Sequence, residues 1–303
     1  MVFVFGAICI DRLRRIPHFP QPGGYVEIES EDVMLGGEAA NTAIALTSWG
    51  TEVTLAGNGL GTDADGDLLR SMVEARSLPL GLLRAGDQAA PVCEIYVTTD
   101  GDRTMFGRGF SHLSEPIPVE QLPYRKGDWF TAEPNLAGYA RAVAAEAAHR
   151  GMKPYLMDFI RDDEPISPGS VWQSSTDWAG HRGNTQKNVQ WVREWADRWG
   201  CTTILSDGPN GFVAGGPTLP TRHYPPFPAP SVVDTTGAGD MFRAGVLFGL
   251  QQGWDLARSL QFGSAAGCLK CGYFGANQHV PSVGEIEAHI AAHPDVSRAY
   301  FGS

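Results

Sequence analysis

Short apolar runs alternate along this chain with segments whose apolar residues recur at helical spacing. The runs predict buried strands over 2–10, 53–56, 129–132, 154–159 and 203–206. The periodic segments predict helices near 38–49, 64–76, 136–150, 186–199, 238–252 and 255–271. Because strands and helices take turns, the pattern indicates an α/β fold with a mostly parallel central sheet flanked by helices.

Two stretches, 25–35 and 92–109, have strand character, and no helix follows either before the next strand. The second contains the pair Asp100-Gly101, which favours a tight hairpin turn. Such strands form a small separate sheet more easily than they join a parallel one. We therefore expect one domain over 1–303, with a small β-sheet lid from about 12–35 and 91–110 over the carboxyl edge of the main sheet.

Two segments of the second half have distinct patterns. The predicted helix at 186–199 carries apolar residues at i, i+3, i+4 and i+7, which indicates a buried stripe: Val192, Trp195, Ala196 and Trp199. The segment 161–185 holds two prolines, three glycines and many polar residues, so we expect a long loop there. A hairpin is expected around 208–211.

Charge and composition narrow the class of protein. The 23 basic and 34 acidic residues give a formal net charge of −11, the wrong sign for a nucleic-acid or anionic-membrane partner. Glycine (37) and proline (21) are abundant without a collagen-like period, and 43% hydrophobic residues suit a globular chain. The five scattered cysteines suggest no disulfide framework, and no signal-peptide pattern or membrane-spanning run is present, so we expect a cytoplasmic protein.

The segment 232–245 carries the most informative chemistry. Gly237-Ala238-Gly239 opens a predicted helix, so unpaired N–H groups and the positive end of the helix dipole would meet there and hold an anion without a lysine. Asp240 follows in the first turn, where a carboxylate can accept a proton from an alcohol that attacks a phosphoryl group. The alternative interpretation is a glycine turn in which Asp240 only complements the helix dipole.

A second glycine pair, Gly36-Gly37, precedes another predicted helix and would let a ligand approach the backbone. Asn41, one turn further, offers both a donor and an acceptor to a hydroxyl group, and Asp11 is suited to a vicinal diol. Arg103 and Arg108, on the expected lid hairpin, are candidates to reach a bound ligand. Each of these residues, taken alone, also has an ordinary structural interpretation as a cap, a loop bridge or a surface charge.

A dinucleotide-binding interpretation is weaker. The residues 59–64 form a G-x-G-x-x-A pattern, but this pattern does not lie at the first strand–helix turn, and no acidic residue is convincingly placed about 20 positions later. The chain also contains no G-x-x-x-x-G-K-[ST] phosphate loop. An oxidoreductase is therefore not expected.

Taken in order, three segments resemble the signatures of the ribokinase-like (PfkB) carbohydrate kinase family, and the resemblance covers nearly the whole chain. The stretch from Gly36-Gly37 to Gly66 is similar to the amino-terminal signature of the family, and the stretch 234–240 is similar to its carboxy-terminal one. The run Ser206-Asp207-Gly208-Pro209-Asn210-Gly211 is similar to the family's T-x-G-x-x-G nucleotide segment, with serine in place of threonine.

The resemblance implies an α/β core with a β-sheet lid, ATP along the carboxy-terminal half, and a sugar or nucleoside between core and lid. It implies Asp240 as the catalytic base and the backbone of 237–239 as the anion hole. Substrate contacts are implied for Asp11, Gly36, Gly37 and Asn41. Nucleotide contacts are implied for Ser206, Gly208, Gly211, Thr236 and Gly239.

The resemblance also implies two metal ions. Many members of the family bind a potassium-like ion beside the anion hole, which here implies Asp234 and the 270–279 loop. The family's N-x-x-E segment organises magnesium through water, and its nearest match in this chain is Ser174-x-x-Asp177. Asp177 is therefore the candidate for magnesium.

We expect an ATP- and magnesium-dependent kinase that phosphorylates a primary hydroxyl of a small sugar, and a homodimer through the lid. A nucleoside kinase, a phosphosugar kinase and a non-catalytic sugar-binding protein stay open as alternatives. Facing aromatic rings from Phe106 and Phe110 would favour a nucleoside. A cationic pocket from Arg103 or Arg108 would favour a phosphosugar, and otherwise Arg103 belongs to the expected set of substrate contacts.

Overall fold

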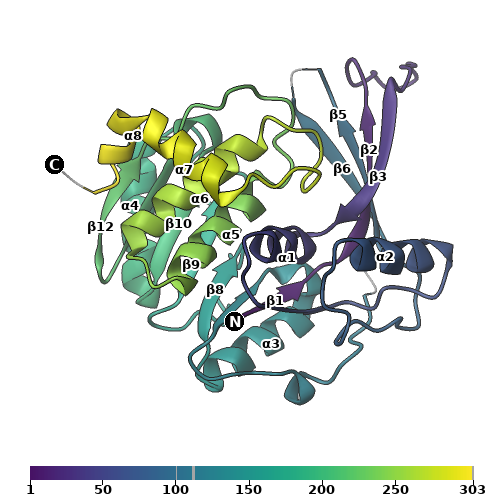
Figure 1. Ribbon diagram of the computed structural model, residues 1–303, viewed down its shortest axis with the longest axis horizontal. Coiled ribbons are helices and arrows are strands. Elements are labelled where there is room, and N and C mark those ends of the chain that lie inside the picture. Colours follow the sequence, from purple (N-terminus) through teal and green to yellow (C-terminus); the bar gives the residue numbers. More distant parts are fainter. Residues whose placement is uncertain (100, 111–112, 302–303) are drawn as a thin grey trace.

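The computed structural model describes residues 1–99, 101–110 and 113–301 and contains two sheets (Figure 1). The larger sheet has eight strands and the smaller has four. Figure 1 shows the small sheet standing beside the main body, which holds the large sheet and most helices.

The large sheet has the strand order β12-β11-β10-β9-β8-β7-β1-β4. From β10 to β4 all neighbours are parallel, whereas β11 and β12 add an antiparallel edge. The strands are β1 (Val2–Gly6), β4 (Val53–Gly57), β7 (Trp129–Ala132), β8 (Lys153–Met157), β9 (Val171–Ser175), β10 (Thr202–Ser206), β11 (Phe212–Gly216) and β12 (Leu219–Tyr224). The predicted α/β class with a mostly parallel sheet is confirmed, as is the hairpin around 208–211.

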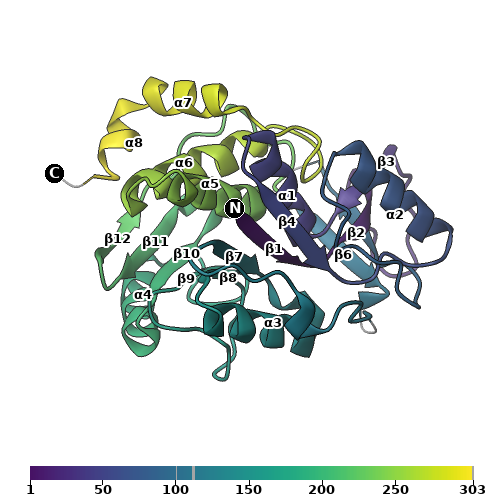
Figure 2. The same cartoon turned by 60° about the horizontal axis from the view of Figure 1, so that its bottom comes forward.

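Helices cover both faces of the large sheet (Figure 2). Helices α1, α5, α6 and α7 lie on one side, and α3 and α4 lie on the other, while α2 packs against strands of the small sheet. Their bounds are α1 (Glu38–Ser48), α2 (Ala64–Ala75), α3 (Ala137–His149), α4 (Thr185–Trp199), α5 (Ala238–Gln251), α6 (Leu256–Lys270), α7 (Val283–Ala292) and α8 (Pro294–Arg298). The six predicted helices are confirmed to within one residue at each end.

The small sheet has the order β3-β2-β5-β6. Its strands are β2 (Cys9–Arg15), β3 (Ser30–Gly36), β5 (Val92–Val97) and β6 (Arg103–Arg108). The antiparallel pair predicted within 92–109 is confirmed, although Asp100 of the predicted turn lies outside the described residues. The strand predicted from residue 25 begins only at Ser30, and the preceding Tyr25 is exposed.

The single strand predicted over 2–10 is wrong. The chain leaves the large sheet after Gly6 and enters the small sheet at Cys9. Between the two sheets, side chains accept the hydrogen bonds of the backbone N–H groups. The Ile8 N–H donates to Asn58 Oδ1 at 2.8 Å, and the Ala7 N–H donates to the Glu133 carboxylate. One apolar run thus supplies strands to both sheets.

The loop predicted over 161–185 is wrong in part, because it contains the central strand β9. Trp172 of this strand is fully buried and donates its indole N–H to the Phe159 carbonyl at 2.7 Å. The polar side chains of Gln173 and Ser174 are only 2% exposed. Their polarity indicated a loop, but they lie near the end of a buried strand.

The core consists mainly of two clusters, one on each face of the large sheet. Because successive side chains of a strand point to opposite faces, Val2 and Val4 pack in one cluster while Phe3 and Phe5 pack in the other. The half-buried Trp195 and Trp199 of the α4 stripe pack against the second cluster, where the Trp195 ring lies 4.8 Å from that of Trp172. Val192 of the same stripe is fully buried in a smaller cluster with Leu205 and Val213. The predicted core role of this stripe is confirmed.

Acidic residues follow four parallel strands of the large sheet at their carboxyl ends: Glu133, Asp158, Asp177 and Asp207. Ligands of open α/β sheets bind at this edge. No helix within the described residues combines the length and apolar character needed to cross a membrane, and the five cysteines are free.

Candidate active site

The amino terminus of α5 presents open backbone donors. Gly237 precedes the helix with a left-handed backbone (φ 75°), and a side chain there would clash with Ala276. The Ala238 N–H donates to the Thr235 carbonyl at 3.2 Å, whereas the N–H groups of Gly237 and Gly239 have no acceptor among the described residues. The predicted anion-binding segment is therefore a helix N-terminus with two free donors, and Gly239 is exposed.

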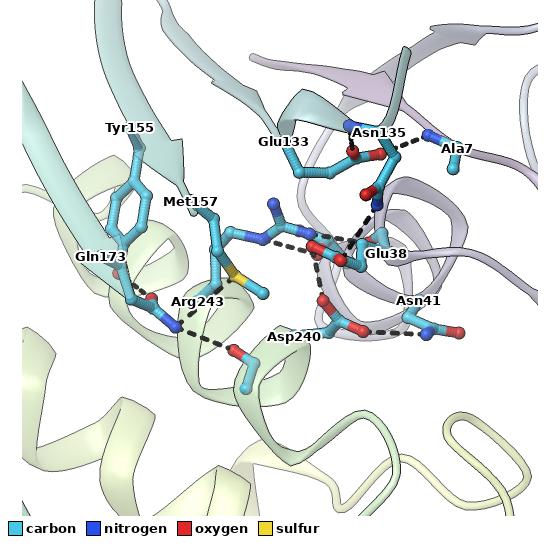
Figure 3. A network of polar contacts seen from close by, with 12 residues as sticks. Ala7, Glu38, Asn41, Glu133, Asn135, Tyr155, Met157, Gln173, Asp240 and Arg243 are labelled. Atoms are coloured by element: carbon cyan, nitrogen blue, oxygen red, sulfur yellow. Dashed lines mark hydrogen bonds and ion pairs between the residues drawn. The ribbon is translucent and has the colours of Figure 1, made fainter. Parts of the chain in front are cut away.

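Asp240 lies buried in the first turn of α5, only 5% exposed. Its Oδ2 accepts a hydrogen bond from Asn41 Nδ2 at 2.9 Å, and its Oδ1 lies 3.2 Å from Arg243 Nη2 (Figure 3). Burial raises the pKa of Asp240 to about 7, although the Arg243 charge lowers it. Asp240 can therefore exchange a proton near neutral pH.

Arg243 ties α5 to α1. Its side chain is 1% exposed, and its Nε donates to Thr42 Oγ1 at 3.0 Å. Its Nη2 donates to the Glu38 carbonyl at 2.8 Å (Figure 3). Breaking a buried ion pair by removing one partner costs folding free energy, because the remaining charge is left buried without a partner. Arg243 thus fixes both the place and the charge of Asp240.

Asn41 links three separate segments. Besides donating to Asp240, it accepts a hydrogen bond on Oδ1 from Asn277 Nδ2 at 2.6 Å. Asn277 Nδ2 also lies 2.6 Å from the Leu35 carbonyl. The predicted hydroxyl-binding residue therefore also orients Asp240.

Asp11 is buried in β2, next to the glycine pair that precedes α1. A Cβ atom on Gly36 would overlap the Asp11 carboxyl group, and Gly37 has a φ of 93° that favours glycine. Burial raises the pKa of Asp11 to about 7, although the hydrogen bond that Cys9 Sγ donates to its Oδ1 lowers this pKa. The Asp11 charge also raises the pKa of Asp240, so the two carboxyl groups lie within electrostatic reach.

The predicted nucleotide positions lie on two segments. Ser206 ends β10, the short 3₁₀ helix η4 (Gly208–Asn210) follows, and Gly211 turns the chain into β11 with a φ of 82°. Thr236 lies just before α5, where its hydroxyl donates to Asp234 Oδ1 at 2.7 Å. The hydroxyl of Thr236 is thus engaged in the loop that leads into α5.

A cavity of about 640 Å³ lies between the small sheet and the loop after β9. Arg103 and Met105 line it from β6, and Asp177 and Arg182 line it from the loop. Arg103 Nη1 donates to Thr235 Oγ1 at 2.7 Å, so the cavity adjoins the segment that leads into α5. The described lining of the cavity does not include Asp240.

Comparison with known proteins identifies the family. The description "pfkB family carbohydrate kinase" matches residues 1–114 and 176–283, which include Asp11, Asn41 and Asp240. The chain belongs to this family. The predicted family is therefore confirmed, and this PfkB protein is a phosphotransferase of the sugar and nucleoside kinase type.

Relatives of known name agree with this assignment. The PfkB chain is 28% identical to an uncharacterized sugar kinase of Dictyostelium discoideum, over 95% of this chain and 96% of that one. It is 25% identical to the ketohexokinase of Mus musculus, over 90% and 97%. The structure of Arabidopsis thaliana ribokinase complexed with ribose and ATP has a TM-score of 0.77 at 18% identity, over 95% and 97%, which shows a shared fold.

The candidate magnesium residues of this PfkB kinase point to different partners. Asp177 forms an ion pair with Arg182, and Ser174 Oγ donates to Asp158 Oδ1 at 2.6 Å. The nearest match to the N-x-x-E segment therefore does not bring its two side chains together. Of that pair, Asp177 alone faces the cavity.

Three residues of the site were not singled out from the sequence: Arg243, Asp158 and Asn277, although Asn277 lies in the 270–279 loop implied for a monovalent cation. Arg243 is a lone cation within the apolar run of α5, a signal that the sequence does carry. Asp158 has a φ of 58° directly after β8, and burial raises its pKa to about 7. Its position at a strand's carboxyl end was a usable signal, whereas nothing local to Asn277 indicates its contact with Asn41.

Proposed function

We propose that this kinase transfers the γ-phosphoryl group of ATP to a primary hydroxyl of a small sugar, with Asp240 as general base. The observation that carries the proposal is the buried Asp240 carboxyl group beside the free N–H groups of Gly237 and Gly239. Phosphoryl transfer needs both parts, an acceptor for the alcohol proton and donors for the charge on the phosphoryl oxygens.

In the proposed reaction, the Asp240 carboxylate takes the proton of the sugar hydroxyl. That oxygen bonds to the γ-phosphorus while the bond from the γ-phosphorus to the β,γ-bridging oxygen breaks, which gives a phosphosugar and ADP. The proton then passes from Asp240 to solvent. Arg243, which contacts Oδ1, favours the charged carboxylate before the reaction.

ATP is proposed to lie along the carboxy-terminal half, with Ser206, Gly208 and Gly211 toward the nucleoside and Thr236 toward the phosphates. The shared fold with a ribokinase whose structure holds ATP supports this placement. Magnesium would neutralise charge on the phosphate oxygens, with Asp177 as the candidate for a contact through water.

The sugar is proposed to bind between α1 and the small sheet, which would act as a lid. Asp11 and Asn41 offer the polar groups, while Gly36 and Gly37 keep the surface open for close approach. Arg103 already contacts Thr235 from the small sheet, which supports closure over the start of α5.

Alternation along β6 puts the Phe106 side chain on the opposite face of the small sheet from Arg103 and Met105. The cavity is lined by Arg103, Thr104 and Met105, so residues of both faces reach it and the nucleoside alternative stays open. Of the two arginines proposed for a phosphosugar, Arg108 pairs instead with Asp65.

The outer face of the small sheet is proposed to pair with a second copy of the chain. Phe106 and Val33 lie at the two ends of one row of this face, with Arg12 and Glu94 between them, and are 55% and 40% exposed. These exposed apolar side chains would be covered in a symmetric pair of chains. Analytical sedimentation of the wild-type protein and of Phe106→Asp tests the proposed dimer, which the substitution should dissociate. If both proteins are monomers at micromolar concentration, the proposed dimer is contradicted.

The assignment is tested by ADP release from ATP with pentoses, hexoses, ketodeoxy acids, phosphosugars and nucleosides, with the product located by ³¹P NMR. We expect a free sugar phosphorylated at a primary hydroxyl. Turnover of nucleosides alone would replace the proposed substrate class. Sugar binding without turnover of any compound would point to the non-catalytic alternative.

A further inference from the structure

Lys270 is a buried cation that the proposed reaction does not use. It is the last residue of α6, and its side chain is fully buried. Its Nζ donates to the Asp234 carbonyl oxygen at 2.7 Å. Asp234 opens the segment that runs through Thr235 and Thr236 to Gly237, so the ammonium contacts the backbone that leads into the proposed anion hole.

The oxygen atoms of Asp234 are already engaged by groups of the protein. Oδ1 accepts hydrogen bonds from the N–H and hydroxyl of Thr236 at 2.8 and 2.7 Å, and Oδ2 accepts one from the Gly275 N–H at 2.8 Å. The carbonyl oxygen takes the Lys270 ammonium. Asp234 therefore has hydrogen-bonded partners at all three oxygens.

These contacts do not fit the potassium-like ion predicted beside the anion hole. An ion bound to the Asp234 carbonyl would have to share it with a cation only a few ångströms away, and like charges at such a distance repel strongly in a buried site. The predicted assignment of Asp234 to a monovalent cation is therefore not supported by its surroundings.

A protonated Lys270 amine carries the charge that such an ion would bring. Burial lowers the pKa of Lys270, and the Asp234 carboxylate opposes that shift. The Asp240 charge acts in the same direction as that of Asp234, so Lys270 lies within electrostatic reach of the catalytic base.

We infer that Lys270 is a built-in substitute for a monovalent cation, a positioning residue that holds the 234–237 backbone and adds positive potential behind the anion hole. The inference rests on the proposed function in so far as 237–239 binds the transferring phosphoryl group. It means that the kinase works without potassium. It also means that loss of the Lys270 ammonium creates a need for a free cation.

The first test uses the wild-type protein. Its kcat and its Tm are measured in potassium chloride and in choline chloride at equal ionic strength. We expect both quantities to agree between the two salts. Activation by potassium of severalfold or more, or a rise in Tm specific to potassium, would overturn the inference.

The second test uses Lys270→Ala, which opens space for an ion, and Lys270→Met, which fills it. In choline we expect kcat to fall about 10–100-fold in both, as for outer-shell partners of a charged site, with little change in the KM for sugar. Potassium or ammonium should restore part of the Lys270→Ala activity and none of the Lys270→Met activity. Lys187→Met, at a lysine on the exposed side of α4, is the matched control.

Full activity of Lys270→Ala in choline, or a loss that no monovalent cation reduces, would count against the inference. If Lys270→Ala does not fold, the wild-type comparison still decides. The Tm response to potassium is independent of catalysis. Failure of the Asp240 assignment, seen as an active Asp240→Asn protein, is therefore distinguishable from failure of the Lys270 assignment.

Discussion

The two sides of the site are built differently. Around Asp240, the side chains of Arg243, Asn41 and Asn277 are buried and joined by hydrogen bonds of 2.6–3.2 Å. Around the cavity, the Asp177–Arg182 pair is exposed to solvent. The proposed proton acceptor is therefore held in place before any ligand arrives, whereas the exposed groups proposed to face the nucleotide are held less tightly.

The largest effect is expected for Asp240→Asn. The amide keeps the shape of the side chain but cannot accept the proton, so kcat should fall about 10²–10⁴-fold, as on loss of a general base. The measurement is steady-state turnover on the best sugar, with circular dichroism to verify folding. Asp295→Asn, at an exposed carboxylate of α8, is the control, and near-normal turnover by Asp240→Asn would remove the base from the proposal.

A substitution at Gly36 should have the next largest effect. In Gly36→Ala the new Cβ would overlap the Asp11 carboxyl group and displace it, and a displacement of about 1 Å can cost about 10²-fold in kcat/KM. We expect the loss mainly in the KM for sugar, with the KM for ATP nearly unchanged. Gly138→Ala, where a Cβ meets nothing within 4 Å, is the control, and equal kinetics for the two variants would contradict the role of Asp11.

The pH profile tests the buried side alone. Because the pKa of Asp240 is raised to about 7 and the base must be ionised, kcat at saturating sugar should fall about tenfold per pH unit below that value. Asn41→Ala removes a hydrogen bond that lowers this pKa, so its acid limb should move to higher pH. A limb at the usual pKa of an aspartic acid in both proteins would contradict this account.

The smallest effect is expected on the open side. Asp177→Asn breaks an exposed ion pair, and such pairs contribute about 0–1 kcal/mol, so the free energy of unfolding should hardly change. We expect at most a few-fold rise in the KM for ATP at limiting magnesium. Urea unfolding and a magnesium titration measure the two quantities, and a loss comparable to that of Asp240→Asn would erase the contrast between the sides.

Local signals predicted much of this molecule. The helices followed from apolar spacing, and Asp240 followed from a glycine-rich helix start, because both depend on neighbours in the chain. The end of β1 at Gly6 could not be predicted, since the acceptors for the N–H groups of Ala7 and Ile8 come from the distant residues Glu133 and Asn58. The 270–279 loop was implied for an ion, but the contacts of Asn277 and Lys270 could not be predicted for the same reason, because each residue contacts a segment tens to hundreds of residues away.

The passage of the chain from β1 to β2 has a mechanical consequence. Asp11 belongs to the small sheet and Asp240 belongs to a helix on the large sheet, and only Ala7 and Ile8 separate the two strands. On the proposed function, one sugar must touch both carboxyl groups. The length of the substrate would then set the distance between the small sheet and α5. A sugar too short to contact both carboxyl groups would leave its hydroxyl out of line with the γ-phosphorus of ATP.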